Sequence, residues 1–343
     1  MGWLSSKRSA DGGFEPSRLY HWLKPSVSGN TVNGLGETSV RRPRPVYHYV
    51  WVKHPWRRWQ NSFYFRISFS LGHLRQFVRA LYLRYAPLRR INPQTESGAP
   101  AQLTEDLREF LLAQGAGDVA VARMQPEWVM ERMQCTEPFV VTMAIPMDYE
   151  LMMRMDEYGR DLRAGVHVIQ KYNDGTALAR LGANWLRERG YHAYGYCGPA
   201  SGKFTSIPAA LAGGLGEIGK HGSIIHRKFG SNFRIAYILT EAVLQEGQPT
   251  QFGADEFCTN CQVCIKHCPP NAISNEKRIV RGVEKWYVDF DKCVSYFNET
   301  YGCGICLPVC PWSRPGVGDG LVAKLARRAK RKAEKAQDAA VDA

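Results

Sequence analysis

Eight of the ten cysteines lie between residues 258 and 310, and their spacing constrains this chain more than any other feature. The first four follow C-x2-C-x2-C-x3-C-P, and the second four follow C-x9-C-x2-C-x3-C-P. Three thiolates on a tight loop cap one face of an iron–sulfur cubane, and the fourth cysteine of the run ligates the other cluster. The spacing therefore predicts two [4Fe–4S] clusters. One is held by Cys258, Cys261, Cys264 and Cys310, and the other by Cys268, Cys293, Cys303 and Cys306.

Two other uses of cysteine fit this pattern less well. Zinc sites use paired C-x2-C elements and four ligands, so a third cysteine at the same spacing followed by C-P is not typical of zinc. Disulfide frameworks belong to small secreted chains, whereas this chain has 343 residues. The two remaining cysteines, Cys135 and Cys197, are expected to be buried apolar residues.

The positive charge is concentrated near the N-terminus. Residues 1–92 contain 16 Lys and Arg against three Asp and Glu, so the net charge of +13 arises there and the remainder is neutral. Such a basic, aromatic-rich region can meet an acidic partner or an anionic membrane surface, or simply be solvated. No nucleic-acid-binding motif accompanies it, and we expect no DNA partner. Membrane-surface contact is the less favoured alternative.

No window of the sequence approaches the roughly 18–20 apolar residues that span a bilayer. The N-terminal residues lack the apolar stretch of a secretory signal, and the residues after Arg41-Arg42 are too charged for a twin-arginine signal. We therefore expect a cytoplasmic protein.

Hydrophobic periodicity divides the chain into four parts. Residues 1–92 form the basic region, with an amphipathic helix over residues 71–90 expected to pack on the core. Residues 93–250 form a core in which helices at 103–115 and 176–189 alternate with strands at 138–147 and 191–196, which indicates an α/β fold. Residues 251–318 carry the cysteines, and residues 319–343 form a basic tail.

A glycine-rich segment precedes the cysteines. Within residues 209–241, glycines would let the backbone approach a large ligand, and two neighbouring side chains would add donors for phosphate or amide groups. Its G-x-G-x-x-G follows helical sequence rather than a strand, which argues against a dinucleotide site. The alternative is a tight turn between packed elements. The candidate cofactor-binding residues are Gly214, Gly216, Glu217, Gly219, Lys220, His221 and Gly222.

At this point the sequence resembles a family. The order GLGEIGKHGSII, FGSNFRIAYILTE, FGADEFCTNCQVCIKHCPPNAI and CVSYFNETYGCGICLPVCP is similar to that of reductive dehalogenases and of the related epoxyqueuosine reductases. The resemblance covers about residues 103–316. The FGxxxFC lead-in favours the dehalogenases, as does GPASGKFTSIP, where epoxyqueuosine reductases usually have an acidic residue.

The resemblance implies a cobalamin held base-off in a flavin-reductase-like α/β core, with a ferredoxin-like domain of two [4Fe–4S] clusters packed against it. The glycine-rich segment would then cradle the corrin. The sequence has no D-x-H-x-x-G motif that would supply a histidine ligand to cobalt.

Reductive removal of halide needs two electrons and one proton, so a weak acid should lie near the cobalt. In the family this acid is a tyrosine beside a lysine or arginine, because the cation stabilises the phenolate. Tyr149 and Lys203 are the best matches in this chain. The reserve candidates are Tyr172, Tyr194, Tyr196 and His192.

The sequence therefore predicts a reductive dehalogenase that acts on an organohalide, with a halogenated phenol or other aromatic preferred. A separate ferredoxin, flavodoxin or reductase would supply the electrons. Two alternatives stay open: a tRNA-modifying reductase similar to epoxyqueuosine reductase, and a non-catalytic dicluster electron-transfer protein.

Overall fold

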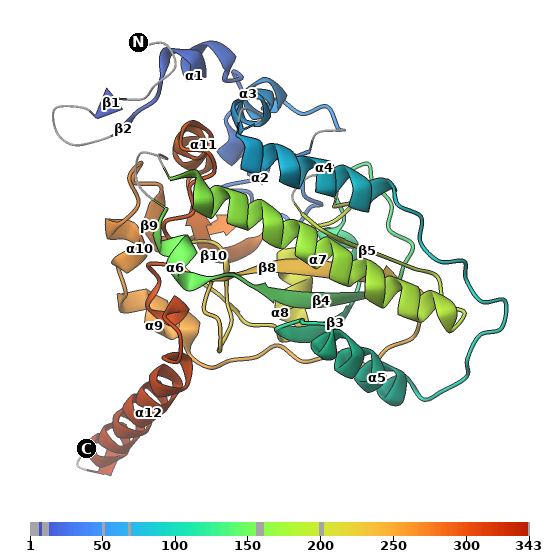
Figure 1. Ribbon diagram of the computed structural model, residues 1–343. Helices are drawn as coiled ribbons and strands as arrows, with labels where there is room; N and C mark the ends of the chain where they lie inside the picture. The colour runs from blue at the N-terminus through green and yellow to red at the C-terminus, as the bar shows by residue number, and fades with distance from the viewer. Residues whose placement is uncertain are drawn as a thin grey trace.

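The computed structural model describes residues 7–8, 14–49, 52–67, 70–155, 161–198 and 202–341. Its centre is a four-stranded sheet of β3 (Asp118–Arg123), β4 (Phe139–Pro146), β8 (Phe233–Thr240) and β5 (Ala193–Cys197), in that spatial order (Figure 1). Each neighbouring pair is antiparallel. β4 lies inside the sheet, and seven of its eight residues are buried, which explains its continuous apolar sequence.

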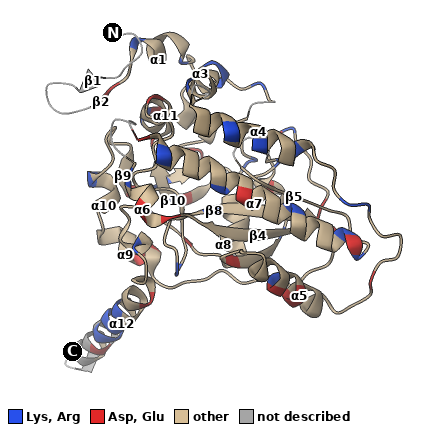
Figure 2. Ribbon diagram, in the orientation of Figure 1, with Lys and Arg blue, Asp and Glu red and all other residues tan. Residues whose placement is uncertain are grey.

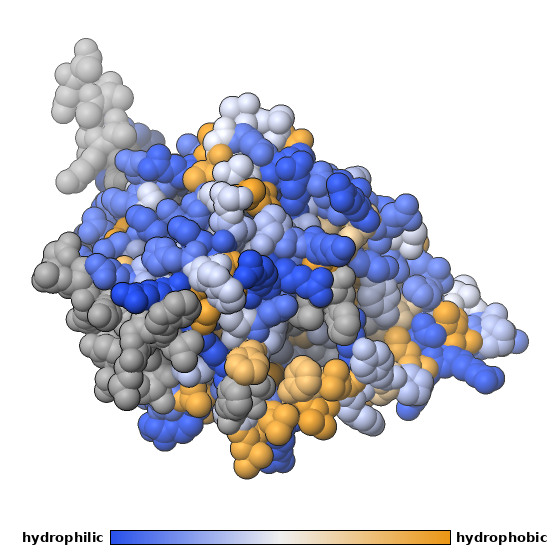
Figure 3. Space-filling view, turned by 90° about the horizontal axis from the view of Figure 1, so that it is seen from above, coloured by the Kyte–Doolittle hydropathy of each residue, from blue (hydrophilic) through white to orange (hydrophobic). Residues whose placement is uncertain are grey.

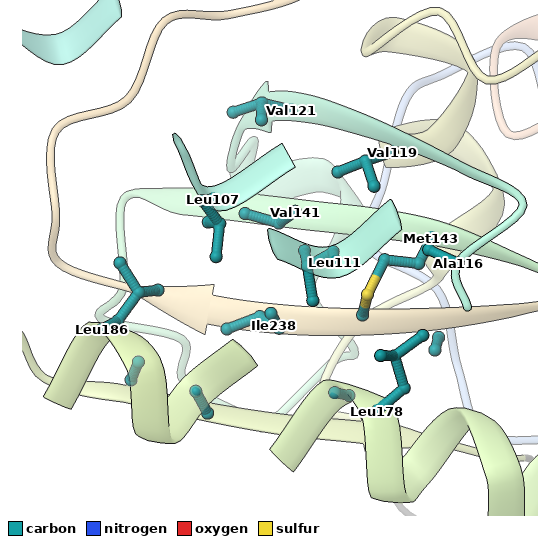
Figure 4. Close-up of a cluster of buried hydrophobic side chains, with 14 of the residues drawn as sticks. Leu107, Leu111, Ala116, Val119, Val121, Val141, Met143, Leu178, Leu186 and Ile238 are labelled. Carbon is teal, nitrogen blue, oxygen red and sulfur yellow. The ribbon is translucent and has the colours of Figure 1, made fainter. Parts of the chain in front are cut away.

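Two helices cover one face of this sheet, and a third covers the other. α5 (Pro100–Ala113) and α7 (Leu162–Glu188) pack on the first face, where Leu107, Leu111 and Leu178 meet apolar strand residues (Figure 4). α8 (Ser206–Ala212) packs on the opposite face through Ala209 and Ala210. The expected mixture of helices and strands is confirmed, although the sheet is antiparallel.

Short elements lie at both ends of the sheet. η1 (Pro126–Trp128) follows β3, and α6 (Tyr149–Met153) follows β4. The glycine-rich segment forms a small hairpin of β6 (Glu217–Ile218) and β7 (Ile224–Ile225). This hairpin lies between α8 and β8 in sequence and leads the chain toward the cysteines.

The cysteine region forms its own set of elements. α9 (Ala254–Asn260) and α10 (Val263–Lys266) precede a hairpin of β9 (Ile273–Val280) and β10 (Val283–Val288). α11 (Phe290–Glu299), η2 (Pro311–Ser313) and α12 (Gly318–Val341) follow. The basic tail is thus helical, and Figure 2 shows Lys and Arg along α12.

The N-terminal region packs mainly on the cysteine region. It contains β1 (Lys7–Arg8), β2 (Phe14–Glu15), α1 (Arg18–Leu23), α2 (Gly29–Asn33) and α3 (Arg57–Ile67). Buried Trp56, Trp59 and Tyr47 form one cluster with Val294 of α11. Serine side chains cap the first turns of α1 and α2.

α4 (Leu71–Tyr85) differs from expectation in its orientation. It runs along α7 as the sequence predicts, but its polar face makes the contact: Asn173 of α7 donates a hydrogen bond to the Gln76 carbonyl at 2.8 Å (Figure 1). Figure 3 views the molecule from above and shows hydrophobic residues, in orange, gathered among hydrophilic residues, in blue. The exposed apolar residues of α4 are Leu71, Leu74, Phe77, Val78, Leu81, Tyr82 and Tyr85.

Within the described residues, no helix is both long enough and apolar enough to cross a bilayer.

Candidate functional site

The first four predicted cluster ligands meet where α9, α10 and η2 converge. Cys258 lies on α9, Cys261 follows it directly, Cys264 lies on α10, and Cys310 precedes η2. Burial raises the pKa of the Cys258 and Cys264 thiols to about 11, and the nearby Cys261 adds to the increase. Burial also raises the pKa of Cys310, to which the other three thiols contribute. The four sulfur atoms therefore share one buried neighbourhood.

The other four predicted ligands form a second neighbourhood. Burial raises the pKa of Cys293 and Cys303 to about 12, and Cys268 adds to the increase at both. Burial is also the main cause of the raised pKa of Cys306, and the neighbouring Cys303, Cys293 and Cys268 add to the increase. Cys264 contributes to the pKa of Cys306, so the two groups adjoin. The grouping agrees with the spacing argument, with the fourth cysteine of each run exchanged between groups.

The donor set fits iron–sulfur clusters. Buried thiols of raised pKa ionise only where a nearby cation compensates them, and cluster iron does this for the cysteines that bind it. In the part of the chain that the structure describes, no three His, Cys, Asp or Glu side chains converge closely enough for one metal ion. A cluster, in contrast, distributes its four thiolates around a larger inorganic core.

The glycines of the β6–β7 segment face the chain itself. A Cβ atom at Gly214 or at Gly216 would lie 2.3 Å from a backbone carbonyl oxygen of this chain. One at Gly219 would lie 2.7 Å from the imidazole two residues later, and Gly222 has a left-handed φ of 76°. These glycines therefore permit tight packing of neighbouring segments. The tight turn between packed elements that the sequence allowed is therefore present, and the role of these glycines beside a cofactor stays a prediction.

Glu217 joins this segment to the cysteine region. One carboxylate oxygen accepts hydrogen bonds from the backbone N–H groups of Phe252 and, at 2.9 Å, Gly253. The other accepts from the Asp255 N–H at 3.1 Å. The carboxylate thus satisfies free N–H groups at the start of α9, the helix that carries Cys258. Its role is to position the cysteine loop.

Lys220 also serves the cysteine loop. Its backbone N–H donates to Cys258 Sγ at 3.4 Å, and its ammonium donates to the Cys261 carbonyl at 2.9 Å and to Asn275 Oδ1 at 2.5 Å. The side chain is therefore engaged away from any phosphate or amide of a corrin, which differs from its predicted role as such a donor.

His221 is engaged within its own segment. Its Nδ1 accepts a hydrogen bond from the Ser223 N–H at 3.2 Å, so the proton lies on Nε2, 2.9 Å from Ser231 Oγ. Burial lowers the pKa of His221 to about 4, so the ring is neutral near pH 7. Its predicted role as a cofactor donor is not the one that the structure assigns.

A cavity of about 880 Å³ opens beside this segment at the end of the sheet. Gly214, Tyr149 and Asn232 border it, and so do Asp118 and His226. His226 Nε2 donates to Asp118 Oδ2 at 3.0 Å, because its Nδ1 accepts the Lys228 N–H. Although burial opposes it, the hydrogen bonds from His226 and the Val119 N–H lower the pKa of Asp118.

Arg234 and Tyr172 form the cation–phenol pair that the chemistry requires. The Arg234 guanidinium carbon lies 5.1 Å from the centre of the Tyr172 ring, with α7 supplying the tyrosine and β8 the arginine. The Arg234 Nε atom is buried and has no hydrogen-bond partner among the described residues. A buried donor of this kind is a binding group for an acceptor on a ligand.

Aromatic residues of the N-terminal region adjoin this pair. His48 Nδ1 lies 3.3 Å from the Tyr64 hydroxyl, and burial, assisted by the Arg234 charge, lowers the pKa of His48 to about 3. Burial is the main cause of the raised pKa of Tyr64, and the neighbouring Tyr196 and Tyr172 add to the increase. The pair is therefore enclosed by rings from separate parts of the chain.

The predicted pair is placed differently. Tyr149 borders the cavity, and its neighbour Asp148 donates its backbone N–H to His167 at 2.9 Å. Lys203 is exposed, and its ammonium lies 5.3 Å from the centre of the Tyr194 ring. The structure therefore brings Lys203 to Tyr194 and brings Tyr172, a reserve candidate, to an arginine that the sequence reasoning missed.

Arg234 left a signal in the sequence. It stands in FRIAYILT, whose other residues are apolar or weakly polar, and an arginine in a buried strand needs a partner or a function. Among the other reserves, Tyr196 lies on β5 beside Tyr237 with ring centres 6.5 Å apart, and the His192 backbone N–H binds Glu241.

The residues present fit a corrinoid in one further respect. Asn232 borders the cavity, and its Oδ1 atom is buried without a hydrogen-bond partner among the described residues, like Arg234 Nε two positions later. An unpartnered buried polar group costs about 1–3 kcal/mol. A cofactor with amide side chains supplies N–H donors for the Asn232 oxygen.

The chain is similar in sequence to several known proteins. A family model described as a 4Fe-4S dicluster domain matches residues 257–313. The tetrachloroethene reductive dehalogenase of Desulfitobacterium hafniense is 31% identical over 244 residues, which cover 67% of this chain and 43% of that protein. The epoxyqueuosine reductase of Salmonella typhimurium is 29% identical over 170 residues, covering 43% of this chain and 41% of that protein.

Solved structures agree in fold. A catabolic reductive dehalogenase in complex with 3-bromo-4-hydroxybenzoic acid superimposes with a TM-score of 0.71 at 21% identity, covering 88% of this chain and 46% of that chain. The chain thus spans less than half the length of the dehalogenases that it matches. Over the part that aligns, this chain is a homologue of the reductive dehalogenases.

Proposed function

We propose that this chain carries out cobalamin-dependent reductive dehalogenation, with electrons relayed by two [4Fe–4S] clusters. The observation that carries the proposal is the Tyr172–Arg234 pair, in which a half-buried arginine lies over a tyrosine ring and its buried Nε has no hydrogen-bond partner among the described residues. A proton donor of this kind is what the cleavage of a carbon–halogen bond requires, whereas an electron carrier has no use for one.

In this proposal the antiparallel sheet and its helices form a flavin-reductase-like core that holds cobalamin base-off. Gly214, Asn232 and Tyr149 would border the cofactor, because they line the cavity at the end of the sheet. Bound cobalamin supplies a cobalt centre that accepts electrons and cleaves carbon–halogen bonds reductively. The side chains of this core bind it, orient it and exclude water.

The overall reaction consumes two electrons and one proton: the carbon–halogen bond breaks, a carbon–hydrogen bond forms, and halide leaves. Clusters pass electrons singly, so two transfers are needed for each turnover. The adjoining cysteine groups, with Cys264 near Cys306, would form the path between an external carrier and the core. A separate ferredoxin, flavodoxin or reductase would be that carrier.

Tyr172 would deliver the proton from its hydroxyl to the carbon from which halide departs. Arg234 then stabilises the phenolate, because a cation near an acid favours its ionised form. Enclosure by His48 and Tyr64 keeps this proton transfer away from bulk water. The His48 ring is neutral near pH 7 and adds no competing charge.

A halogenated phenol is the substrate class that we propose. The rings of Tyr64, Tyr172 and Tyr196 offer faces and edges on which an aromatic ring can pack. The Arg234 Nε–H can donate to a phenolate or carboxylate oxygen, which a chlorinated ethene lacks.

Replacement of Tyr172 by phenylalanine tests the proton donor. The protein would be purified without oxygen, reconstituted with iron, sulfide and cobalamin, and assayed with a chemical one-electron reductant. We expect Tyr172→Phe to lower kcat by about 10²–10⁴-fold for 3-bromo-4-hydroxybenzoic acid. Iron content, cobalt content and the visible spectrum should stay unchanged, because the ring is kept.

Tyr149→Phe is the matched comparison, since Tyr149 borders the cavity without a cation recorded beside its ring. Its effect on kcat should be much smaller. The reverse result, with activity lost in Tyr149→Phe and kept in Tyr172→Phe, would restore the donor predicted from the sequence. Wild-type protein that binds about eight irons but no cobalt would instead indicate a dicluster electron carrier.

A further inference from the structure

Lys220 is a buried cation whose partners are neutral. Its side chain is only 1% exposed. The ammonium donates to the Cys261 carbonyl at 2.9 Å, to the Thr259 carbonyl at 3.5 Å and to Asn275 Oδ1 at 2.5 Å. All three N–H groups are thus satisfied as hydrogen bonds, but none of these acceptors carries a negative charge.

The acidic residue of this neighbourhood is already paired. Asp255 accepts from Lys277 Nζ at 2.7 Å and from Trp286 Nε1 at 2.6 Å. The Lys220 ammonium lies 4.8 Å from the centre of the same Trp286 ring. Among the described residues, no carboxylate forms an ion pair with Lys220.

A charge this deeply buried needs a compensating charge, because its transfer from water costs several kcal/mol. The first cysteine group is next to it: the Lys220 backbone N–H donates to Cys258 Sγ at 3.4 Å. The Lys220 ammonium also donates to the carbonyl of Cys261, a second ligand of this group. Lys220 therefore lies against the ligands whose negative charge it can balance.

We infer that Lys220 is the counter-ion of the [4Fe–4S] cluster held by Cys258, Cys261, Cys264 and Cys310, and that it raises the reduction potential of this cluster. The inference rests on the proposed binding of two clusters. Four thiolates around an oxidised [4Fe–4S]²⁺ core give a net charge of −2, and the uptake of one electron makes it −3. A fixed buried cation stabilises the reduced form more than the oxidised form, because the attraction grows with the charge.

Lys220→Met tests this effect, because it keeps an unbranched stem and removes the charge and its three donors. We expect the equilibrium constant for reduction of the first cluster to fall by about tenfold or more, which is about 59 mV for one electron. The second cluster should keep its potential within a third of that shift, since the hydrogen bonds of Lys220 go to the loop of the first cluster and to Asn275. A redox titration followed by electron paramagnetic resonance measures both clusters in one sample.

Lys277→Met is the matched control. Lys277 lies 5.3 Å from the same Trp286 ring, but its side chain is 33% exposed and paired with Asp255. Exposed pairs are screened by water, so this variant should shift the first cluster by much less than Lys220→Met does. An equal shift in both variants would contradict a specific role for Lys220.

Asn275→Asp tests the same charge without removing Lys220. The substitution places a carboxylate on the ammonium and cancels its charge, so the potential of the first cluster should fall as in Lys220→Met. If Lys220→Met loses iron, Asn275→Asp still tests whether the Lys220 charge raises the potential of the first cluster. Unchanged potentials in Asn275→Asp would overturn the inference, and a wild-type protein without two cluster signals would overturn the proposed function instead.

Discussion

At His221, burial sets the charge of the ring. Nδ1 accepts a hydrogen bond from the Ser223 N–H and could not accept it once the ring is protonated, whereas Nε2 would still donate to Ser231 Oγ. The pKa is about 4 in the folded chain against 6.5 for a free histidine. Between pH 4 and pH 6.5 the His221 ring is therefore neutral in the folded protein and protonated in the unfolded chain.

This difference predicts a pH dependence of stability. The contribution of His221 is complete above pH 6.5 and is lost as the pH falls toward 4, because protons then favour the unfolded chain. Between pH 7 and pH 5 the wild type should lose about 2 kcal/mol of unfolding free energy more than His221→Gln. Denaturant unfolding of the reconstituted proteins at both pH values measures the difference.

The same exchange at exposed His21 serves as the control and should leave the pH dependence unaltered. A His221→Gln protein with the wild-type dependence on pH would show that this ring is not the group that excludes the proton.

Some residues of the candidate site could be predicted from the sequence, and others could not. The cysteines were predictable because ligand spacing is a local property of the sequence, and the two groups in the structure match it. The Tyr172–Arg234 pair was not, because it joins a helix and a strand whose contact depends on the packed sheet. Glu217, Lys220 and His221 were noticed as polar donors, but their partners lie in segments that only folding brings together.

Helices α4 and α5 show how similar apolar patterns lead to opposite orientations. Leu111 of α5 is completely buried, whereas Leu74 of α4 is 45% exposed. We expect Leu111→Ala to lower the free energy of unfolding by about 2–5 kcal/mol, because it leaves a cavity in the core. Leu74→Ala should change it by about 0.5 kcal/mol or less, as is usual at exposed positions.

Chemical denaturation of the two variants beside the wild type provides the measurement. A loss at Leu74 as large as that at Leu111 would mean that the outer face of α4 is covered in solution.

The sequence predicted a helix correctly where its hydrophobic pattern was clear. The predicted helix at 103–115 corresponds to α5, which starts at Pro100 and ends before a left-handed Gly115. α7 was predicted only from residue 176, because Asn173, Asp174 and Gly175 read as helix breakers. Packing overrides them: a Cβ at Gly175 would lie 2.7 Å from Cys197 Sγ, so the glycine lets the helix approach the sheet.

Across the whole molecule, the N-terminal region and the cysteine region are joined by a buried polar contact. Asn298 of α11 donates to the Trp59 carbonyl at 2.6 Å, and the Trp59 indole donates to the Val294 carbonyl at 3.2 Å. Asn298→Ala should lower the free energy of unfolding by about 1–3 kcal/mol, because the Trp59 carbonyl keeps only its bond from Ser62 Oγ and the buried Tyr47 hydroxyl loses the Asn298 donor.

Asn92→Ala, at an exposed asparagine that donates to the Glu188 carbonyl, is a suitable comparison for the same chemical change. Denaturant midpoints of both variants, followed by tryptophan fluorescence, measure the effect. Equal stability of wild type and Asn298→Ala would show that this contact does not hold the two regions together.

The contact between Trp59 and Asn298 also imposes an order on biosynthesis. Its partners are 239 residues apart, so a ribosome adding about 5–20 residues each second needs roughly 12–48 s to supply the second after the first. During that interval Trp56 and Trp59 have no α11 to cover them. The aromatic segment of the nascent chain is then a candidate client for chaperones, and its burial waits until α11 has been translated.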